Sequence, residues 1–123
     1  MRVVAREVDA ANCPQALRSY LGQTLITPAR SYDVHAMCVF DGIVFFQIID
    51  DAGLPSWIPS WPFDVVDDSP ASDWHCQTLR GKLSLVLGPE FIAKSEDAYR
   101  AMVELDEQQV ARFWKRVGAL SPR

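Results

Sequence analysis

The clearest pattern of apolar and polar positions lies in the middle of the chain. Residues 32–40 form an extended run, and residues 43–49 form a second run that is rich in β-branched and aromatic side chains. Asp41 and Gly42 separate the runs and are typical of a tight hairpin, because both turn positions need a positive φ. The second run is apolar on both faces, which predicts a central place in a sheet. In the first run, five alternate side chains are predicted to share one face: Tyr32, Val34, Ala36, Cys38 and Phe40.

Further short elements are predicted on both sides of this hairpin. β-prone runs bounded by turn residues indicate strands at residues 1–9, 24–27, 63–66, 74–79 and 83–87. A short helix is predicted after Pro14, since proline suits the first helical position, and Gly22 is expected to end it. Residues 50–53 and 80–81 are predicted turns.

Residues 54–63 contain three prolines, which exclude a regular helix and a central strand. This stretch is interpreted as a Pro-rich loop, and burial and partial exposure both stay open for its rings, Trp57 and Trp61. Trp74 lies on a predicted strand and is expected in the core, because large aromatic side chains dominate small cores.

The C-terminal part has helical patterns. Ser95 is predicted to cap a helix that runs to about Glu104. Asp106 and Gln109 have the spacing of a capping box, which predicts the start of a second helix. Its buried face is expected to contain the apolar residues at i, i+3, i+4 and i+7, which are Val110, Phe113, Trp114 and Val117.

Together these elements predict an α+β fold in a single domain over residues 1–123. A small, strongly bent antiparallel sheet, of which an SH3-like half-barrel is one form, is expected to be covered by two C-terminal helices. The length of 123 residues and the 49% of hydrophobic residues suit one domain with a real core.

The charge distribution is uneven. The formal net charge is −4, yet no Lys or Arg lies between Arg30 and Arg80. This middle stretch is unsuited to nucleic acid, because phosphate binding needs Lys and Arg. Turn chemistry explains Asp41, Asp50 and Asp51, since aspartate is favoured in turns. The aspartates of the stretch are Asp33, Asp41, Asp50, Asp51, Asp64, Asp67, Asp68 and Asp73.

The sequence indicates an intracellular setting. No apolar run approaches the ~20 residues needed to cross a bilayer, and residues 1–7 have no secretory apolar region. A cytoplasmic protein without a membrane partner is therefore expected. An odd number of cysteines, Cys13, Cys38 and Cys76, argues against a disulfide framework and favours buried free thiols.

No motif for a reaction or a cofactor stands out. His75 adjoins Cys76, and alternation on a strand points the two side chains apart; the same argument places His35 and Cys38 on opposite faces. The five Cys and His residues include no C-x-x-C pair for zinc, and the aspartates lack the spacing of a calcium loop. Neither a metal nor a cofactor is predicted.

Several short segments resemble small bacterial immunity-type proteins of polymorphic toxin systems. They cover less than half of the chain and are Tyr32-Asp33-Val34-His35-Ala36, Asp41-Gly42-Ile43, Pro55-Ser56-Trp57-Ile58-Pro59, Phe63-Asp64-Val65-Val66-Asp67 and Asp73-Trp74. The resemblance implies an acidic protein of variable fold that neutralises a cognate toxin by direct binding. It implies no catalytic residue.

The leading hypothesis is a non-enzymatic binding protein, an immunity-like inhibitor that presents acidic loops to a basic toxin domain. Electrostatic complementarity with a basic partner supports it independently of the resemblance. The residues expected to meet the partner are Trp57, Trp61, Asp64, Asp67, Asp68 and Asp73.

Two alternatives stay open. An SH3-like module would bind a Pro-rich or extended peptide through Trp57 and Trp61, and it requires an open aromatic groove. A small enzyme would use His75, Cys76 or paired aspartates, and it requires a pocket in which those groups converge.

Overall fold

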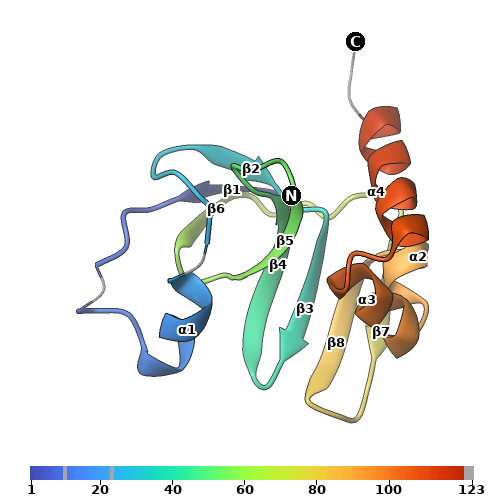
Figure 1. Ribbon diagram of the computed structural model, residues 1–123, viewed down its shortest axis with the longest axis horizontal. Coiled ribbons are helices and arrows are strands. Elements are labelled where there is room, and N and C mark those ends of the chain that lie inside the picture. Colours follow the sequence, from blue (N-terminus) through green and yellow to red (C-terminus); the bar gives the residue numbers. More distant parts are fainter. Residues whose placement is uncertain (10, 23, 121–123) are drawn as a thin grey trace.

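Eight strands form two antiparallel sheets, and with the helices they make an α+β fold (Figure 1). The computed structural model describes residues 1–9, 11–22 and 24–120. The small sheet has the order β2-β1-β6, with β1 (Arg2–Ala5), β2 (Ser31–Asp33) and β6 (Phe63–Asp67). The large sheet has the order β5-β4-β3-β8-β7, with β3 (Ala36–Phe40), β4 (Ile43–Ile49), β5 (Pro55–Pro59), β7 (Trp74–Thr78) and β8 (Leu83–Pro89).

The helices lie at the two ends of the chain. A 3₁₀ turn, η1 (Gln15–Leu17), leads into α1 (Arg18–Leu21), which confirms the short N-terminal helix. The C-terminal helices are α2 (Glu90–Ala93), α3 (Glu96–Val103) and α4 (Glu107–Leu120). The two predicted helices correspond to α3 and α4, and α2 is an additional short helix. Among the described helices, none combines the length and the apolar character needed to span a lipid bilayer.

The large sheet separates two hydrophobic cores, with the small sheet on one side and helices α2–α4 on the other (Figure 1). The core toward the small sheet contains Val3, Ala5, Tyr32, Val34, Phe46, Ile48, Ile58 and Phe63. The core toward the helices contains Ala36, Cys38, Phe45, Leu83, Val86, Ile92, Ala93, Met102 and Phe113. Alternation along a strand sends neighbouring residues to different cores, so every buried position of β4 has something to pack against.

The central hairpin is confirmed. β3 and β4 pair antiparallel with Phe40 opposite Ile43, and the two turn residues, Asp41 and Gly42, have φ values of 52° and 77°. Both φ values fall in the left-handed region that a two-residue hairpin turn needs. β4 lies between β3 and β5 with both faces covered, as its apolar pattern predicts.

The first run of the hairpin is shorter than predicted, and this correction matters for the fold. Residues 32–40 do not form one strand: β2 belongs to the small sheet and β3 to the large one, with the crossing at Val34 and His35. Val34 N donates to Met1 O at 2.9 Å, and His35 N donates to Gln47 O at 2.8 Å. Tyr32 and Val34 therefore enter one core while Ala36 and Cys38 enter the other.

Two further predictions need correction. Residues 24–27 form no strand, because their polar groups bond to other elements; Thr27 N, for example, donates to the Tyr32 hydroxyl at 2.8 Å. Part of the Pro-rich stretch is a strand, β5, which forms an edge of the large sheet. An edge tolerates proline because one side of the strand has no hydrogen-bonding neighbour.

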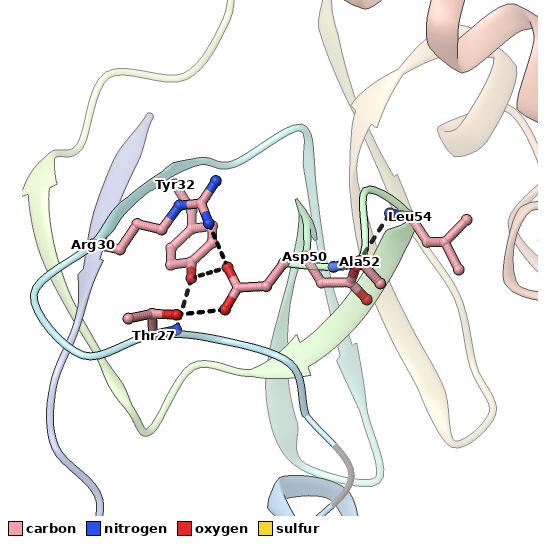
Figure 2. Close-up of polar contacts among 7 residues, drawn as sticks. Thr27, Arg30, Tyr32, Asp50, Ala52 and Leu54 are labelled. Atoms are coloured by element: carbon pink, nitrogen blue, oxygen red, sulfur yellow. Dashed lines mark hydrogen bonds and ion pairs between the residues drawn. The ribbon is translucent and has the colours of Figure 1, made fainter.

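A polar network fixes the chain beside the small sheet, as Figure 2 shows for its labelled members. Asp51 accepts hydrogen bonds from Thr27 Oγ1 at 2.6 Å, Tyr32 Oη at 2.7 Å and Arg30 Nη1 at 2.9 Å. The hydrogen bonds from Thr27 and Tyr32, with the Arg30 charge, hold the pKa of Asp51 below its usual value. The neighbouring Asp50 closes its own turn by accepting from Ala52 N and Leu54 N (Figure 2).

The C-terminal helices begin as their capping residues predict. Ser95 Oγ accepts from Ala98 N at 3.1 Å, and Asp106 Oδ2 accepts from Gln108 N and Gln109 N. The Gln109 side chain does not complete a capping box; its Nε2 donates to Phe91 O and Ala98 O, and so ties α4 to α2 and α3. In α4 Phe113 is buried, as expected, whereas Trp114 is 40% exposed.

Candidate functional site

An open aromatic groove lies where α1, α3 and the helix-facing side of the large sheet meet. The first half of the groove is a hollow of about 390 Å³. The floor and walls of this half come from Tyr20, Phe40, Phe45, Trp57, Leu83, Tyr99 and Val103, with Glu96 and Arg100 at the rim. We call this surface, together with the adjoining half described next, the aromatic groove.

The second half of the groove adjoins the first and shares Tyr20, Trp57 and Val103 with it. It has a similar volume of about 390 Å³ and reaches Leu25 and Leu105. Four of its side chains are well exposed for large apolar residues: Tyr20 at 41%, Leu25 at 53%, Val103 at 46% and Leu105 at 42%. Large apolar residues that are exposed next to one another mark interaction sites more often than chance.

The aromatic side chains of the groove hold one another in place. The ring of Tyr99 from α3 meets Trp57 of β5 edge-on at 5.2 Å between centroids, and Tyr20 of α1 meets Phe45 of β4 at the same distance. Edge-to-face pairs at this spacing are favourable. The groove is thus assembled by three segments that are far apart in sequence.

Beneath the groove, Cys38 Sγ and Tyr99 Oη lie 3.4 Å apart. Burial raises the pKa of the Cys38 thiol to about 11 and also raises the pKa of Tyr99. Both groups are therefore neutral at physiological pH. Their role in the geometry is to position the Tyr99 ring, which is a wall of the groove.

Next to the groove, β4 and β5 contain buried polar atoms without a hydrogen-bond partner. Gln47 is 0% exposed, and neither its Oε1 nor its Nε2 has a partner among the described residues. Its cross-strand neighbour Trp57 has an unpartnered Nε1. Buried polar groups are normally paired, so such atoms concentrate at places that stability alone does not explain.

Of the residues predicted to meet a partner, Trp57 alone lines the groove. Trp61 and Asp64 lie together elsewhere, joined by Arg6. Arg6 Nη2 donates to Trp61 O, its guanidinium lies over the Trp61 ring at 5.6 Å, and its Nε is 3.4 Å from Asp64 Oδ1. Trp57 and Trp61 therefore do not form one peptide groove.

Asp67 and Asp68 lie at the end of β6 and in the following loop, and both are exposed. Asp67 Oδ1 accepts from Ser69 N at 3.0 Å, which lowers the pKa of Asp67. No cation of the described chain is within ion-pair distance of either carboxylate. These two are the predicted acids that stay available to a basic partner.

Asp73 is bound by Arg116 of α4. The guanidinium donates twice, from Nε at 2.7 Å and from Nη2 at 2.8 Å, and these bonds hold the pKa of Asp73 low. Two parallel bonds to one carboxylate make a strong, oriented pair. The Asp73 side chain is thus engaged in holding the β6–β7 connection against α4.

Arginines from outside the base-free stretch pair with half of its eight aspartates. Besides the pairs with Asp64 and Asp73, Arg2 is 3.6 Å from Asp33 and Arg30 is 2.9 Å from Asp51. A segment that is purely acidic in sequence is therefore mixed in charge in space. The acids of β6 make up a smaller surface than the sequence suggests.

The histidines occupy neighbouring hollows. His35 lines a hollow of about 220 Å³ with Asp33 and Arg116, and His75 lines an open one on the other side of Arg116. Burial and the Arg116 charge lower the pKa of His35 to about 4, and its ring meets Phe113 edge-on at 5.1 Å.

Two predictions about the cysteines and histidines are wrong. His35 and Cys38 do not point to opposite faces: each contacts a residue of the C-terminal helices, because β3 begins only at Ala36 and strand alternation does not reach His35. Cys13 and Cys38 are buried as free thiols, but Cys76 on the edge strand β7 is exposed. In the described part of the chain, no group of three or more Cys, His, Asp or Glu is placed to hold a metal ion.

Sequence reasoning missed Tyr20, Tyr99 and Val103 as site residues. Tyr20 lies in the predicted short helix after Pro14, and Tyr99 and Val103 lie in the predicted helix that Ser95 caps, with no local feature that marks them as site residues. A helical spacing of i and i+4 places Tyr99 and Val103 on one face, yet the same spacing is typical of any core-facing helix. In comparisons with known proteins, no family model, curated protein or solved structure matches the chain.

Proposed function

We propose that this chain is a non-enzymatic binding protein, an immunity-like inhibitor that acts in the cytoplasm by binding a bacterial toxin domain directly. The observation that carries the proposal is the aromatic groove, which is open, has aromatic walls and is bordered by exposed apolar residues. Aromatic residues set in a concave surface are the usual anchors of protein–protein recognition.

The edge strand beside the groove limits how a partner binds. Hydrogen bonds from Ser60 N to Val44 O and from Asp50 N to Leu54 O set the register of β5 against β4. In this register the backbone N–H and C=O groups of Ser56 and Ile58 point toward β4. The backbone groups of residues 55, 57 and 59 point away from β4, toward the open edge of the sheet. Two of these residues are prolines, which have no N–H to donate. A partner is therefore held by side chains inserted into the groove and not by an added strand.

A growth assay tests this function. The chain is co-expressed with the toxin encoded by the adjacent gene, and survival of the host is measured. We expect Tyr20→Ala and Val103→Ser to lower binding to that toxin by tenfold or more, because both remove apolar surface at the groove (about 1.4 kcal/mol per tenfold change). Both positions are well exposed, at 41% and 46%, so the fold is expected to survive the changes.

Val66→Ser is the matched control. Val66 is also apolar and 58% exposed, but it lies on β6 away from the groove. Unchanged neutralisation by Tyr20→Ala and Val103→Ser, together with a loss in Val66→Ser, would move the binding surface to the acidic residues of β6. Absence of any protection by the wild-type chain would refute the inhibitor function.

A peptide-binding module is the second candidate, and the position of Trp57 in the groove favours it. Trp61 would have no part in it, since that ring lies under Arg6. Binding of Pro-rich peptides that is lost in Tyr20→Ala, in a protein that protects against no toxin, would favour this candidate over the first.

A further inference from the structure

One bank of the aromatic groove is acidic. Between Ser95 and Glu107 the chain has five carboxylates and one guanidinium. We call the five carboxylates the acidic bank: Glu96, Asp97, Glu104, Asp106 and Glu107. Glu96 lines the first half of the groove itself, and Glu104 lies between Val103 and Leu105, which line the second half.

The single cation of this bank is already engaged. Arg100 Nη2 is 3.7 Å from Glu96 Oε1, and Arg100 Nη1 is 3.8 Å from Asp97 Oδ1. On the opposite bank, the Arg18 guanidinium donates to Cys13 O. Residues 95–107 therefore keep an excess of four carboxylates beside the groove, from five carboxylates and one guanidinium.

We propose that the groove receives a cationic amphipathic segment of the partner, with bulky apolar side chains in the aromatic hollow and Lys or Arg residues beside the acidic bank. This proposal rests on the binding function above and specifies the chemistry of the partner. Each half of the groove, at about 390 Å³, has room for large side chains. Complementary charge around an apolar centre fixes orientation and raises the rate of association.

The cation-binding surface thus lies at the acidic bank, whereas the sequence placed it at Asp64, Asp67, Asp68 and Asp73, of which Asp67 and Asp68 have no ion-pair partner in the described part of the chain. The two acidic surfaces can be separated by mutation. Asp97→Lys with Glu104→Lys reverses two charges of the acidic bank, and Asp67→Lys with Asp68→Lys reverses two charges at β6. Both double variants change the net charge by the same amount, so each is the matched control of the other.

The probes are two synthetic peptides with the same leucine and tryptophan positions, one with four lysines and its twin with four glutamates. Fluorescence anisotropy at low and moderate salt measures their binding to the full chain. We expect the lysine peptide to bind at least tenfold more tightly than its twin. The acidic-bank variant should weaken this binding about five- to tenfold, and the β6 variant should change it less than twofold. Salt should weaken the binding to the wild-type chain, because exposed charges are screened.

Three results would overturn the inference. Equal binding of both peptides would remove the role of charge, and a larger loss in the β6 variant than in the acidic-bank variant would return the site to Asp67 and Asp68. Full binding by Tyr20→Ala would show that the peptide lies outside the groove. Thermal unfolding of each variant shows that the fold is retained.

A second copy of this chain is the competing occupant of the groove. Sedimentation of the wild-type chain and of Tyr20→Ala tests it, and a dimer that Tyr20→Ala dissociates would overturn the inference. Protection against the toxin in the growth assay is measured separately. Protection with no preference for the lysine peptide would leave the inhibitor function standing and refute only this choice of partner chemistry.

Discussion

On β4, Phe46 and Ile48 point toward the small sheet, whereas Phe45 and Gln47 point toward the helices. Phe45 lines the aromatic groove, and Gln47 is the cross-strand neighbour of Trp57, which also lines it. The first pair is covered completely by a second sheet, and Ile48 is 0% exposed. In the second pair, Phe45 lines a groove in which Tyr20 and Val103 are still 41% and 46% exposed. Neighbouring residues of one strand thus serve a closed side and an open side of the same sheet.

The two sides also differ in how they treat polar groups. Beside the small sheet, the Tyr32 hydroxyl both donates to Asp51 and accepts from Thr27 N. On the helix-facing side, Gln47 and Trp57 hold three of the five buried side-chain polar atoms that have no partner in the described part of the chain, whereas the small-sheet core has one, Trp74 Nε1. The closed side is built for stability, and the open side bears a cost in stability that fits a binding surface.

The largest expected effect comes from opening the closed side. Ile48→Ala should lower the free energy of unfolding by about 2–5 kcal/mol, because it leaves a cavity between two sheets. Val103→Ser at the groove should change it by less than about 1 kcal/mol, since the side chain is exposed. Urea unfolding of both variants measures the difference, and equal losses would contradict the division into a closed and an open side.

The next effect is a dependence of stability on pH through His35. Its pKa is about 4 in the folded chain, against an ordinary value of 6.5, so the unfolded chain binds the proton more readily. The contribution of His35 to the free energy of unfolding is fully present above pH 6.5. It is lost as the pH falls through 4, and the total loss is about 3 kcal/mol. Unfolding in urea between pH 7 and pH 4 should show this slope for the wild-type chain and a smaller slope for His35→Gln. The same slope in both would show that carboxylates cause the loss.

A smaller gain in stability is expected on the helix-facing side of β4. Gln47→Leu should raise the free energy of unfolding by about 1–2 kcal/mol, because it removes two buried polar atoms that have no partner. Thermal and urea unfolding measure this, with Gln77→Leu as a control at a half-buried amide on the edge strand β7. A loss of stability in Gln47→Leu would mean that the amide has hydrogen-bond partners and that the two sides of β4 do not differ in this respect.

The smallest effect concerns reactivity and leaves stability unchanged. Cys76 is exposed and should react with iodoacetamide at pH 7.5, whereas Cys38 should resist, because burial raises its pKa to about 11. Mass spectrometry of the labelled chain shows which thiol reacts, and Cys76→Ser provides the control. Rapid labelling of Cys38 in the folded chain would indicate that the groove opens down to Tyr99.

Local chemistry explains the parts of the fold that the sequence predicted well. The turn at Asp41 and Gly42 and the caps at Ser95 and Asp106 each depend on residues within a few positions of one another. The division of residues 32–40 into β2 and β3 could not be foreseen in this way. It depends on Met1 and Gln47, which bind the backbone of Val34 and His35 from distant parts of the chain. The SH3-like form of the sheet stays a prediction.

The candidate site could be predicted only in part, for the same reason. Trp57 was singled out for its neighbouring prolines, and it does line the groove, but Tyr20 and Tyr99 reach that groove from helices at opposite ends of the chain. Their spacing along the sequence is too large for any pattern to connect them. Trp61 had the same local signal as Trp57, yet it lies under Arg6 on another surface.

By itself the sequence determined the α+β class, the central hairpin and the helix caps, since these follow from alternation, turn residues and capping residues. It also determined that residues 31–79 contain no lysine or arginine. Only the tertiary structure decided what that stretch means, because Arg2, Arg6, Arg30 and Arg116 return to pair with four of its aspartates. Coulomb interactions act across space and not along the chain, so a charge pattern in sequence becomes a surface only after folding.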